Sequence, residues 1–151
     1  MTKGKRDMSE IRDFKERFGS PESFRVYAEC MYRPTAERFA QVANDLKNRL
    51  GVSIFAYLEA DRVQGIIAVE AASRQTAVIL GIAVDAACRR NGIGRRLIAE
   101  TAARLDLGVL TAETDDDAVC FYRRCGFQTV AFEKTFGREA CRRYRCTLRL
   151  R

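Results

Sequence analysis

Histidine is missing from this 151-residue chain. Without an imidazole, no Ser-His or Cys-His nucleophile pair can form, which excludes most hydrolases. No histidine is present to complete a zinc site, and the six cysteines include no Cys-x-x-Cys pair. We therefore expect no metal, and reduced thiols that mostly fill the core. The cysteines are Cys30, Cys88, Cys120, Cys125, Cys141 and Cys146.

Long apolar runs are missing as well. No segment approaches the ~20 residues that a membrane-spanning helix needs. The basic N-terminal residues are not followed by an apolar stretch, so no signal peptide is predicted. We expect a cytoplasmic protein without a membrane partner, folded as a single domain over residues 1–151, with residues 1–8 as a loose leader.

Charge is abundant and unbalanced. The net charge is +7, from 27 basic and 20 acidic residues, and residues 138–151 hold six arginines and one glutamate. A basic surface attracts nucleic acids, anionic membranes and polyphosphate ligands alike. Because no recognisable nucleic-acid-binding motif accompanies the charge, nucleic acid is not the expected partner. The role of the arginine-rich C-terminal segment stays open.

The N-terminal third has the apolar spacing of two helices. Ser20 can cap the first helix, and Pro21 suits its first position. Pro34 is expected to end this helix and open a second, which Gly51 closes. A weakly alternating first strand is expected over residues 9–14.

The rest of the chain alternates strand-like and helical segments. Val- and Ile-rich runs predict an antiparallel meander, and a strand-loop-helix-strand unit follows it. The expected strands are residues 52–58, 63–71, 77–84, 109–113, 127–132 and 144–150, with helices at 95–105 and from 114–117 to Gly126. This pattern predicts an α+β fold, with helices on a mixed sheet.

The loop at residues 89–94 is the most informative segment. An apolar strand runs into it and a helix begins at once, while Gly92 and Gly94 let the backbone approach a ligand closely. The first amides of the helix then form an anion site, with arginines around it. A dinucleotide fingerprint would need glycine where Leu97 stands, and a Walker loop would need Gly-Lys-Ser/Thr. A simple helix start with incidental arginines remains the alternative.

The wider pattern Arg89-x-x-Gly92-x-Gly94 after Ile82-Ala83-Val84 resembles the acetyl-CoA-binding motif of the GNAT superfamily of N-acetyltransferases. The resemblance implies a GNAT-type, mainly antiparallel sheet flanked by helices, with acetyl-CoA as co-substrate. In that family the strand offers backbone groups to the pantetheine arm and the loop amides hold the diphosphate. The cofactor contacts implied by the resemblance are Ile82, Ala83, Val84, Arg89, Arg90, Asn91, Gly92, Gly94 and Arg95.

A second pattern downstream also resembles the family. It reads Asp115-x-x-Ala118-x-x-Phe121-Tyr122-x-x-x-Gly126-Phe127. The resemblance implies that Tyr122 is the general acid that protonates the departing CoA thiolate, which reference pKa values of about 8.5 for a thiol and about 10 for a phenol make plausible. Asp115 stands where asparagine is common, so it is either a further cofactor contact or a helix cap.

The implied reaction is a direct attack of an amine on the thioester carbonyl, with a backbone N–H near Val84 facing the oxyanion. A lysine-like amine costs about 4.6 kcal/mol to deprotonate at pH 7, and an α-amine about 1.4 kcal/mol. Glu113 and Glu70 are the candidate bases, although either could be a solvated strand residue. A water chain or another tyrosine is the alternative.

These patterns predict an acetyl-CoA-dependent N-acetyltransferase acting on a primary amine of a small molecule or peptide. The alternative is a non-catalytic CoA-binding regulatory or interaction module. A homodimer is possible. The acceptor and the preferred acyl chain cannot be derived from the sequence.

Overall fold

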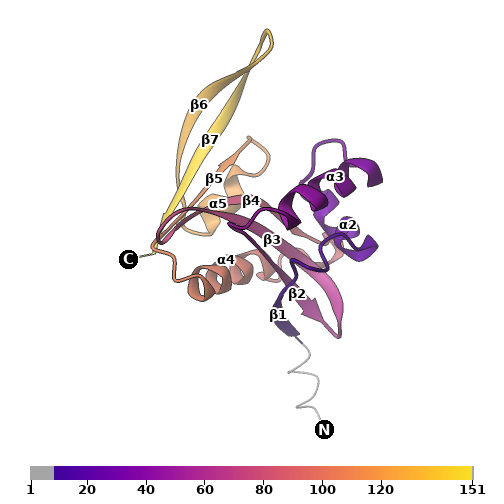
Figure 1. Ribbon diagram of the computed structural model, residues 1–151. Coiled ribbons are helices and arrows are strands. Elements are labelled where there is room, and N and C mark those ends of the chain that lie inside the picture. Colours follow the sequence, from indigo (N-terminus) through magenta and orange to yellow (C-terminus); the bar gives the residue numbers. More distant parts are fainter. Residues whose placement is uncertain (1–8, 151) are drawn as a thin grey trace.

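The computed structural model describes residues 9–150, so the loose leader expected at residues 1–8 lies outside the described residues. One seven-stranded sheet has the strand order β1-β2-β3-β4-β5-β7-β6, and helices lie against it (Figure 1). The elements are β1 (Ser9–Asp13), α2 (Pro21–Tyr27), η1 (Ala28–Cys30), α3 (Ala36–Lys47), β2 (Val52–Glu59), β3 (Arg62–Ser73), β4 (Thr76–Val84), η2 (Ala86–Cys88), α4 (Ile93–Arg104), β5 (Val109–Thr114), α5 (Val119–Arg124), β6 (Gln128–Phe136) and β7 (Glu139–Arg149).

Within residues 9–150 only one pair of neighbouring strands is parallel. β4 and β5 pair at three positions, from Thr76 with Val109 to Val78 with Thr111, while every other pair is antiparallel. A parallel pair needs a crossover, which α4 supplies between β4 and β5. The predicted mixed, mainly antiparallel α+β fold with a central β-loop-α-β unit is confirmed.

The sheet separates two apolar cores. On one side α4 and α5 cover residues such as Ile67, Leu110 and Ala112. On the other side α2 and α3 cover residues such as Ile66 and Ala83. Because side chains alternate along a strand, neighbouring residues of β3 enter different cores. We call these two sides the α4/α5 side and the α2/α3 side.

The predicted helix signals are partly confirmed. The Ser20 side chain accepts a hydrogen bond from the Ser23 amide at 3.2 Å, and Pro21 is the first helical residue. Thr35, rather than Pro34, opens α3, because its hydroxyl accepts from the Arg38 amide at 3.1 Å. The expectation that Gly51 closes this helix is wrong, since α3 already ends at Lys47.

The C-terminal strands are longer than the sequence pattern predicts. β6 and β7 form one hairpin, which turns at Gly137 (φ 62°) and projects beyond the body (Figure 1). The arginine-rich segment is thus largely β7. Near the hairpin tip most side chains on both strands are exposed, so no apolar alternation marks these residues as strand. Within residues 9–150 no helix is both long and apolar enough to span a membrane.

Candidate active site

An opening lies between β4 and β5. Their pairing stops at Val78 and Thr111, yet β4 runs on to Val84 and β5 to Thr114. Beyond that point β4 is bonded only to β3, and Leu80 is an extra residue where the β3–β4 register shifts. The opening exposes one backbone edge of β4 to whatever enters between the strands.

The loop that follows β4 holds two left-handed backbone conformations. Arg90 has φ 69° and Gly92, the N-cap of α4, has φ 74°. Such conformations are costly for residues other than glycine and occur often at functional sites. The Asn91 side chain donates to the Cys88 carbonyl at 3.2 Å, which fastens the loop to η2. Asp85 caps η2 by accepting from the Ala87 amide at 3.1 Å.

The N-terminus of α4 has free donors. The first helical bond is from the Arg96 amide to the Gly92 carbonyl at 3.0 Å, and Gly92 brings no side-chain cap. The amides of residues 93–95 are therefore left for an external acceptor at the positive end of a 12-residue helix. This geometry suits a diphosphate.

Gly94 is needed for a reason that the sequence does not reveal. It is buried, and a Cβ there would lie 2.8 Å from the ring of Phe121 on α5. The phenyl ring thus packs directly on the first turn of α4. Because Tyr122 follows Phe121, this contact ties the anion-binding end of α4 to the predicted catalytic side chain.

The arginines around the loop have partners within the chain. Arg89 binds the Glu29 carboxylate at 2.5 Å and the Val84 carbonyl at 3.4 Å. Arg95 donates to the Arg124 carbonyl at 2.5 Å, at the C-terminal end of α5. A ligand would therefore meet backbone amides directly, and Arg89 and Arg95 only after these side chains turn.

Tyr122 is buried in the core on the α4/α5 side. Its side chain is 6% exposed and packs edge-on against Phe121 and Phe127, with ring centroids 5.3 and 5.2 Å away. Burial raises the pKa of the Tyr122 phenol well above its ordinary value, and nearby Cys146 and Cys30 add to the shift. Tyr122 is therefore a neutral hydrogen-bond donor throughout the physiological pH range.

Asp115 has a local structural role. Its carboxylate accepts hydrogen bonds from the amides of Asp117 and Ala118, both at 3.0 Å, in the turn before α5. Asp115 thus stabilises this turn and is not the N-cap of α5, which is Ala118 and has no side-chain cap. The carboxylate is engaged by the backbone, so its predicted contact with the cofactor stays a prediction.

Two residues that the sequence does not mark line the opening from the α2/α3 side. Tyr27 is 4% exposed, and a Cβ added at Gly81 of β4 would overlap its hydroxyl. The same Cβ would lie 3.2 Å from the Cys30 sulfur, which also interacts with the backbone of Ile82. Cys30 contributes to the raised pKa of Tyr122, and Tyr122 contributes to that of Tyr27, so the three groups lie near one another.

These two residues are uncharged. Burial raises the pKa of Tyr27 far above its ordinary value, with smaller effects of Cys30 and Tyr122. Cys30 is exposed as a residue, but its sulfur lies against β4, and this burial raises its pKa to about 12. Helical spacing alone predicts Tyr27 as a core residue. The one signal in the sequence is Gly81, because a glycine within a strand often marks a place where another group, here the Tyr27 ring, packs closely on the backbone.

The two candidate bases occupy different places. Glu113 lies near the open end of β5, where its Oε2 accepts from Lys134 Nζ and Arg143 Nε, both at 3.1 Å. These two cations outweigh its partial burial and lower the pKa of Glu113. Glu70 lies opposite Val78 at the closed end of the opening and binds Arg49 at 3.0 Å. Val78 is four residues, roughly 13 Å, from Ile82 along β4.

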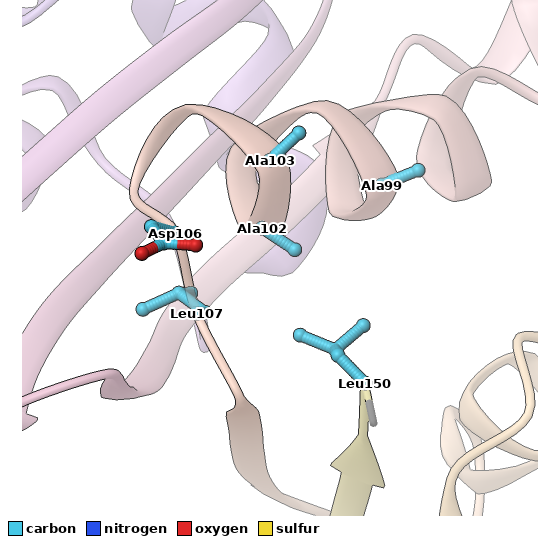
Figure 2. Close-up of a pocket in the computed structure, with 6 residues that line it drawn as sticks. All are labelled: Ala99, Ala102, Ala103, Asp106, Leu107 and Leu150. Atoms are coloured by element: carbon cyan, nitrogen blue, oxygen red, sulfur yellow. The ribbon is translucent and has the colours of Figure 1, made fainter.

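A shallow apolar hollow lies elsewhere. Alanines of α4 and Leu107 line it together with Leu150, and Asp106 stands at its rim (Figure 2). It is at the C-terminal end of α4, roughly 18 Å from the loop at the N-terminal end. It therefore has no part in the site around Tyr122.

Comparisons with known proteins agree with this geometry. The family profile described as an acetyltransferase (GNAT) domain matches residues 51–129. A GNAT-family structure from Desulfovibrio desulfuricans is 24% identical, with a TM-score of 0.73 over 95% of this chain and 99% of that one. No curated protein matches the chain.

Two further structures have the same fold at lower identity. The ribosomal-protein-S18-alanine N-acetyltransferase from Escherichia coli is 16% identical, with a TM-score of 0.73 over 95% of this chain and 94% of that one. A GNAT-family acetyltransferase from Elizabethkingia anophelis with acetyl-CoA bound is 16% identical, with a TM-score of 0.67 over 95% and 99% of the two chains. Because the family profile spans more than half of the sequence and includes the loop and Tyr122, the chain belongs to the GNAT acetyltransferase family.

Proposed function

We propose that this protein transfers the acetyl group of acetyl-CoA directly to a primary amine of a small molecule or peptide. The observation that carries the proposal is the opening between β4 and β5, which has free helix amides at one end and Tyr122 beside it. An acyl-CoA is long enough to reach from an anion site to such an opening, and its diphosphate and thioester match the two ends chemically.

The cofactor contacts follow from the loop and the strand. The diphosphate binds the amides after Gly92, and the exposed backbone of Ile82, Ala83 and Val84 meets the pantetheine arm. The arginines of the loop, Arg89, Arg90 and Arg95, balance the charge of the diphosphate, and Asn91 adds a polar side chain. The acetyl-CoA bound in the Elizabethkingia anophelis relative supports this ligand.

The chemistry requires a neutral amine. Its nitrogen attacks the thioester carbonyl carbon, the oxyanion faces a backbone N–H near Val84, and the carbon–sulfur bond then breaks. Tyr122 donates a hydrogen bond to the departing thiolate. Because burial raises the pKa of Tyr122, complete proton transfer to a thiol with an ordinary pKa of about 8.5 is unfavourable, so we assign hydrogen-bond donation to Tyr122. The thiolate then takes up the proton that the amine loses.

The proton acceptor is best assigned to water. Glu113 is held between two cations, which reduces its basicity, and Glu70 lies at the wrong end of the opening. We therefore propose that the amine reaches the site unprotonated and that water relays the proton it loses on acylation to the CoA thiolate. A direct base role of Glu113 would appear as a kcat loss in Glu113→Gln with every acceptor.

An amine panel tests the function. We expect free CoA to be released, in step with acetylated product, with at least one primary amine. Binding of acetyl-CoA without acetylation across the panel would favour a non-catalytic CoA-binding module. No increase in melting temperature at millimolar acetyl-CoA would contradict CoA binding itself.

A further inference from the structure

The far side of the opening carries positive charge. Glu113 faces the α2/α3 side, because its neighbour Ala112 is buried in the core on the α4/α5 side. Lys134 and Arg143 of the hairpin contact the same Oε2 atom of Glu113. Arg145 lies opposite Glu113 in the β5–β7 pairing and stacks over Phe132 at 4.8 Å.

This cluster has more cations than anions. Lys134, Arg143 and Arg145 stand against the single carboxylate of Glu113, and within residues 9–150 no carboxylate forms an ion pair with Arg145. Arg143 uses only its Nε atom on Glu113, so its terminal guanidinium nitrogens keep their hydrogen-bonding capacity. The cluster can therefore bind an additional anion.

The cluster and Tyr27 lie at similar distances along the strands from the point where the pairing of β4 with β5 ends. Gly81, under the Tyr27 hydroxyl, is three residues past the last paired position of β4. Glu113 is two residues past the last paired position of β5. Tyr27 and the cluster thus form opposite rims at a similar height on the α2/α3 side.

Two other acids near the site, Glu29 and Asp116, are engaged by neighbouring side chains. Glu29 binds Arg89 at 2.5 Å. Asp116 accepts from the Tyr144 hydroxyl at 2.7 Å and pairs with Arg142 at 3.3 Å. A bound ammonium would therefore meet the uncharged Tyr27 and a cluster whose net charge is positive despite Glu113, which favours its neutral form.

We propose that the acceptor is an amine that carries a carboxylate or phosphate group, with the anionic group bound by Lys134 and Arg143 and the neutral amine beside Tyr27. This proposal rests on the proposed N-acetyltransferase function and names its substrate class. The guanidinium fork suits both anions. The Tyr27 hydroxyl oxygen accepts a hydrogen bond from the amine and turns its lone pair towards the thioester.

Matched acceptors test the class. Glycine, O-phosphoethanolamine, glycinamide and ethanolamine are compared by kcat/KM per unprotonated amine, which removes the differences in amine pKa. We expect one or both anionic amines to exceed their neutral counterparts by about 10- to 100-fold, as for a hydrogen bond to a charged group. The comparison of glycine with glycinamide reports on a carboxylate, and the comparison of O-phosphoethanolamine with ethanolamine reports on a phosphate.

Variants test whether Lys134 and Arg143 bind the anionic group of the acceptor. Arg143→Gln and Lys134→Gln should each raise KM for the anionic acceptor about 10-fold while leaving neutral amines and acetyl-CoA affinity unchanged. Arg138→Gln, at the turn of the same hairpin, is the control for a charge lost from the hairpin and should change nothing. Glu113→Gln should lower KM for the anionic acceptor, because it frees both cations. Circular dichroism checks that each variant folds.

The outcomes distinguish failure of the proposed acceptor class from failure of the proposed N-acetyltransferase function. Equal or better turnover of the neutral amines would overturn the acceptor class and leave the N-acetyltransferase function intact. A uniform loss with all acceptors in Arg143→Gln and Lys134→Gln would show a structural role and also overturn the class. Binding of acetyl-CoA with no turnover of any amine would overturn both.

Discussion

The two sides of the sheet meet at the same opening but are built differently. On the α4/α5 side, Gly94 and Phe121 pack in direct contact, and Tyr122 is buried beside them. On the α2/α3 side, the hairpin brings Lys134 and Arg143 to Glu113, and these side chains remain partly exposed.

Under the proposed function, this difference separates donor binding from acceptor choice: the α4/α5 side is the donor side and the α2/α3 side is the acceptor side. The donor side depends on backbone conformation and tight packing, which few substitutions can satisfy. The acceptor side depends on exposed side chains of the hairpin, which can be exchanged at little cost to stability. We expect changes on the first side to impair the whole reaction and changes on the second to alter which amine reacts.

The largest expected effect is on catalysis by Tyr122. Tyr122→Phe removes the hydroxyl and keeps the packing against Phe121 and Phe127, so kcat should fall about 100-fold. The dissociation constant of acetyl-CoA, measured by calorimetry, should change little. Unchanged kcat would show that the hydroxyl does not assist the leaving thiolate.

Gly81→Ala should disturb the acceptor side through a steric overlap. The added Cβ would displace the buried Tyr27 ring and cost about 2 kcal/mol of stability. It should also raise the acceptor KM. Denaturant unfolding and steady-state kinetics check both effects, with Gly19→Ala as control because nothing lies within 4 Å of a Cβ there. Stability equal to the control would contradict the close approach of Tyr27.

Gly94→Ala should act on the donor side with a smaller loss of stability. The overlap with Phe121 is partly offset by the higher helix propensity of alanine, which leaves about 1 kcal/mol of destabilisation. Because the displaced ring adjoins both the loop and Tyr122, affinity for acetyl-CoA should also fall. Calorimetry that finds wild-type affinity would separate Gly94 from the cofactor site.

The smallest expected effect is on stability at high pH. Burial raises the pKa of Tyr27 and Tyr122, so the folded state keeps their protons after the unfolded state begins to lose them near its pKa of about 10. Their contribution is fully present below pH 10 and is lost as the pH rises further. Between pH 8 and pH 10.5 each of these two tyrosines should lower the free energy of unfolding by about 0.8 kcal/mol.

The matched pair for this prediction is Tyr27→Phe and Tyr32→Phe. Tyr27→Phe should flatten the decline in stability, whereas Tyr32→Phe should not, because Tyr32 is 79% exposed. Denaturant midpoints at the two pH values give the answer. Equal slopes in both variants would contradict the burial of Tyr27.

The donor side could be read from the sequence because its chemistry is local. Gly92 and Gly94 stand at fixed spacing between a strand and a helix, and Tyr122 lies in a second motif. The acceptor side could not be predicted from the sequence, because its contacts form between distant segments. Tyr27 and Gly81 meet only through the packing of α2 on β4, and Glu113 meets Arg143 only once β7 pairs with β5. No local spacing records such contacts.

The hairpin shows the same limit in the fold. Strand signals depend on one buried face, and near its tip β6 has exposed side chains on both faces. The sequence therefore predicted residues 127–132 and missed the remainder of β6. It also left the role of the arginine-rich segment open, whereas in the structure the pairing of β7 with β5 brings Arg143 to Glu113.

The most direct test of the central claim is calorimetric titration with acetyl-CoA and with S-acetylpantetheine, which keeps the thioester but lacks the diphosphate. If the amides at the start of α4 hold the diphosphate, acetyl-CoA should bind at least about 100-fold more tightly, since several hydrogen bonds to a charged group are lost in the shorter ligand. Equal affinities, or no binding of acetyl-CoA at millimolar concentration, would contradict the account.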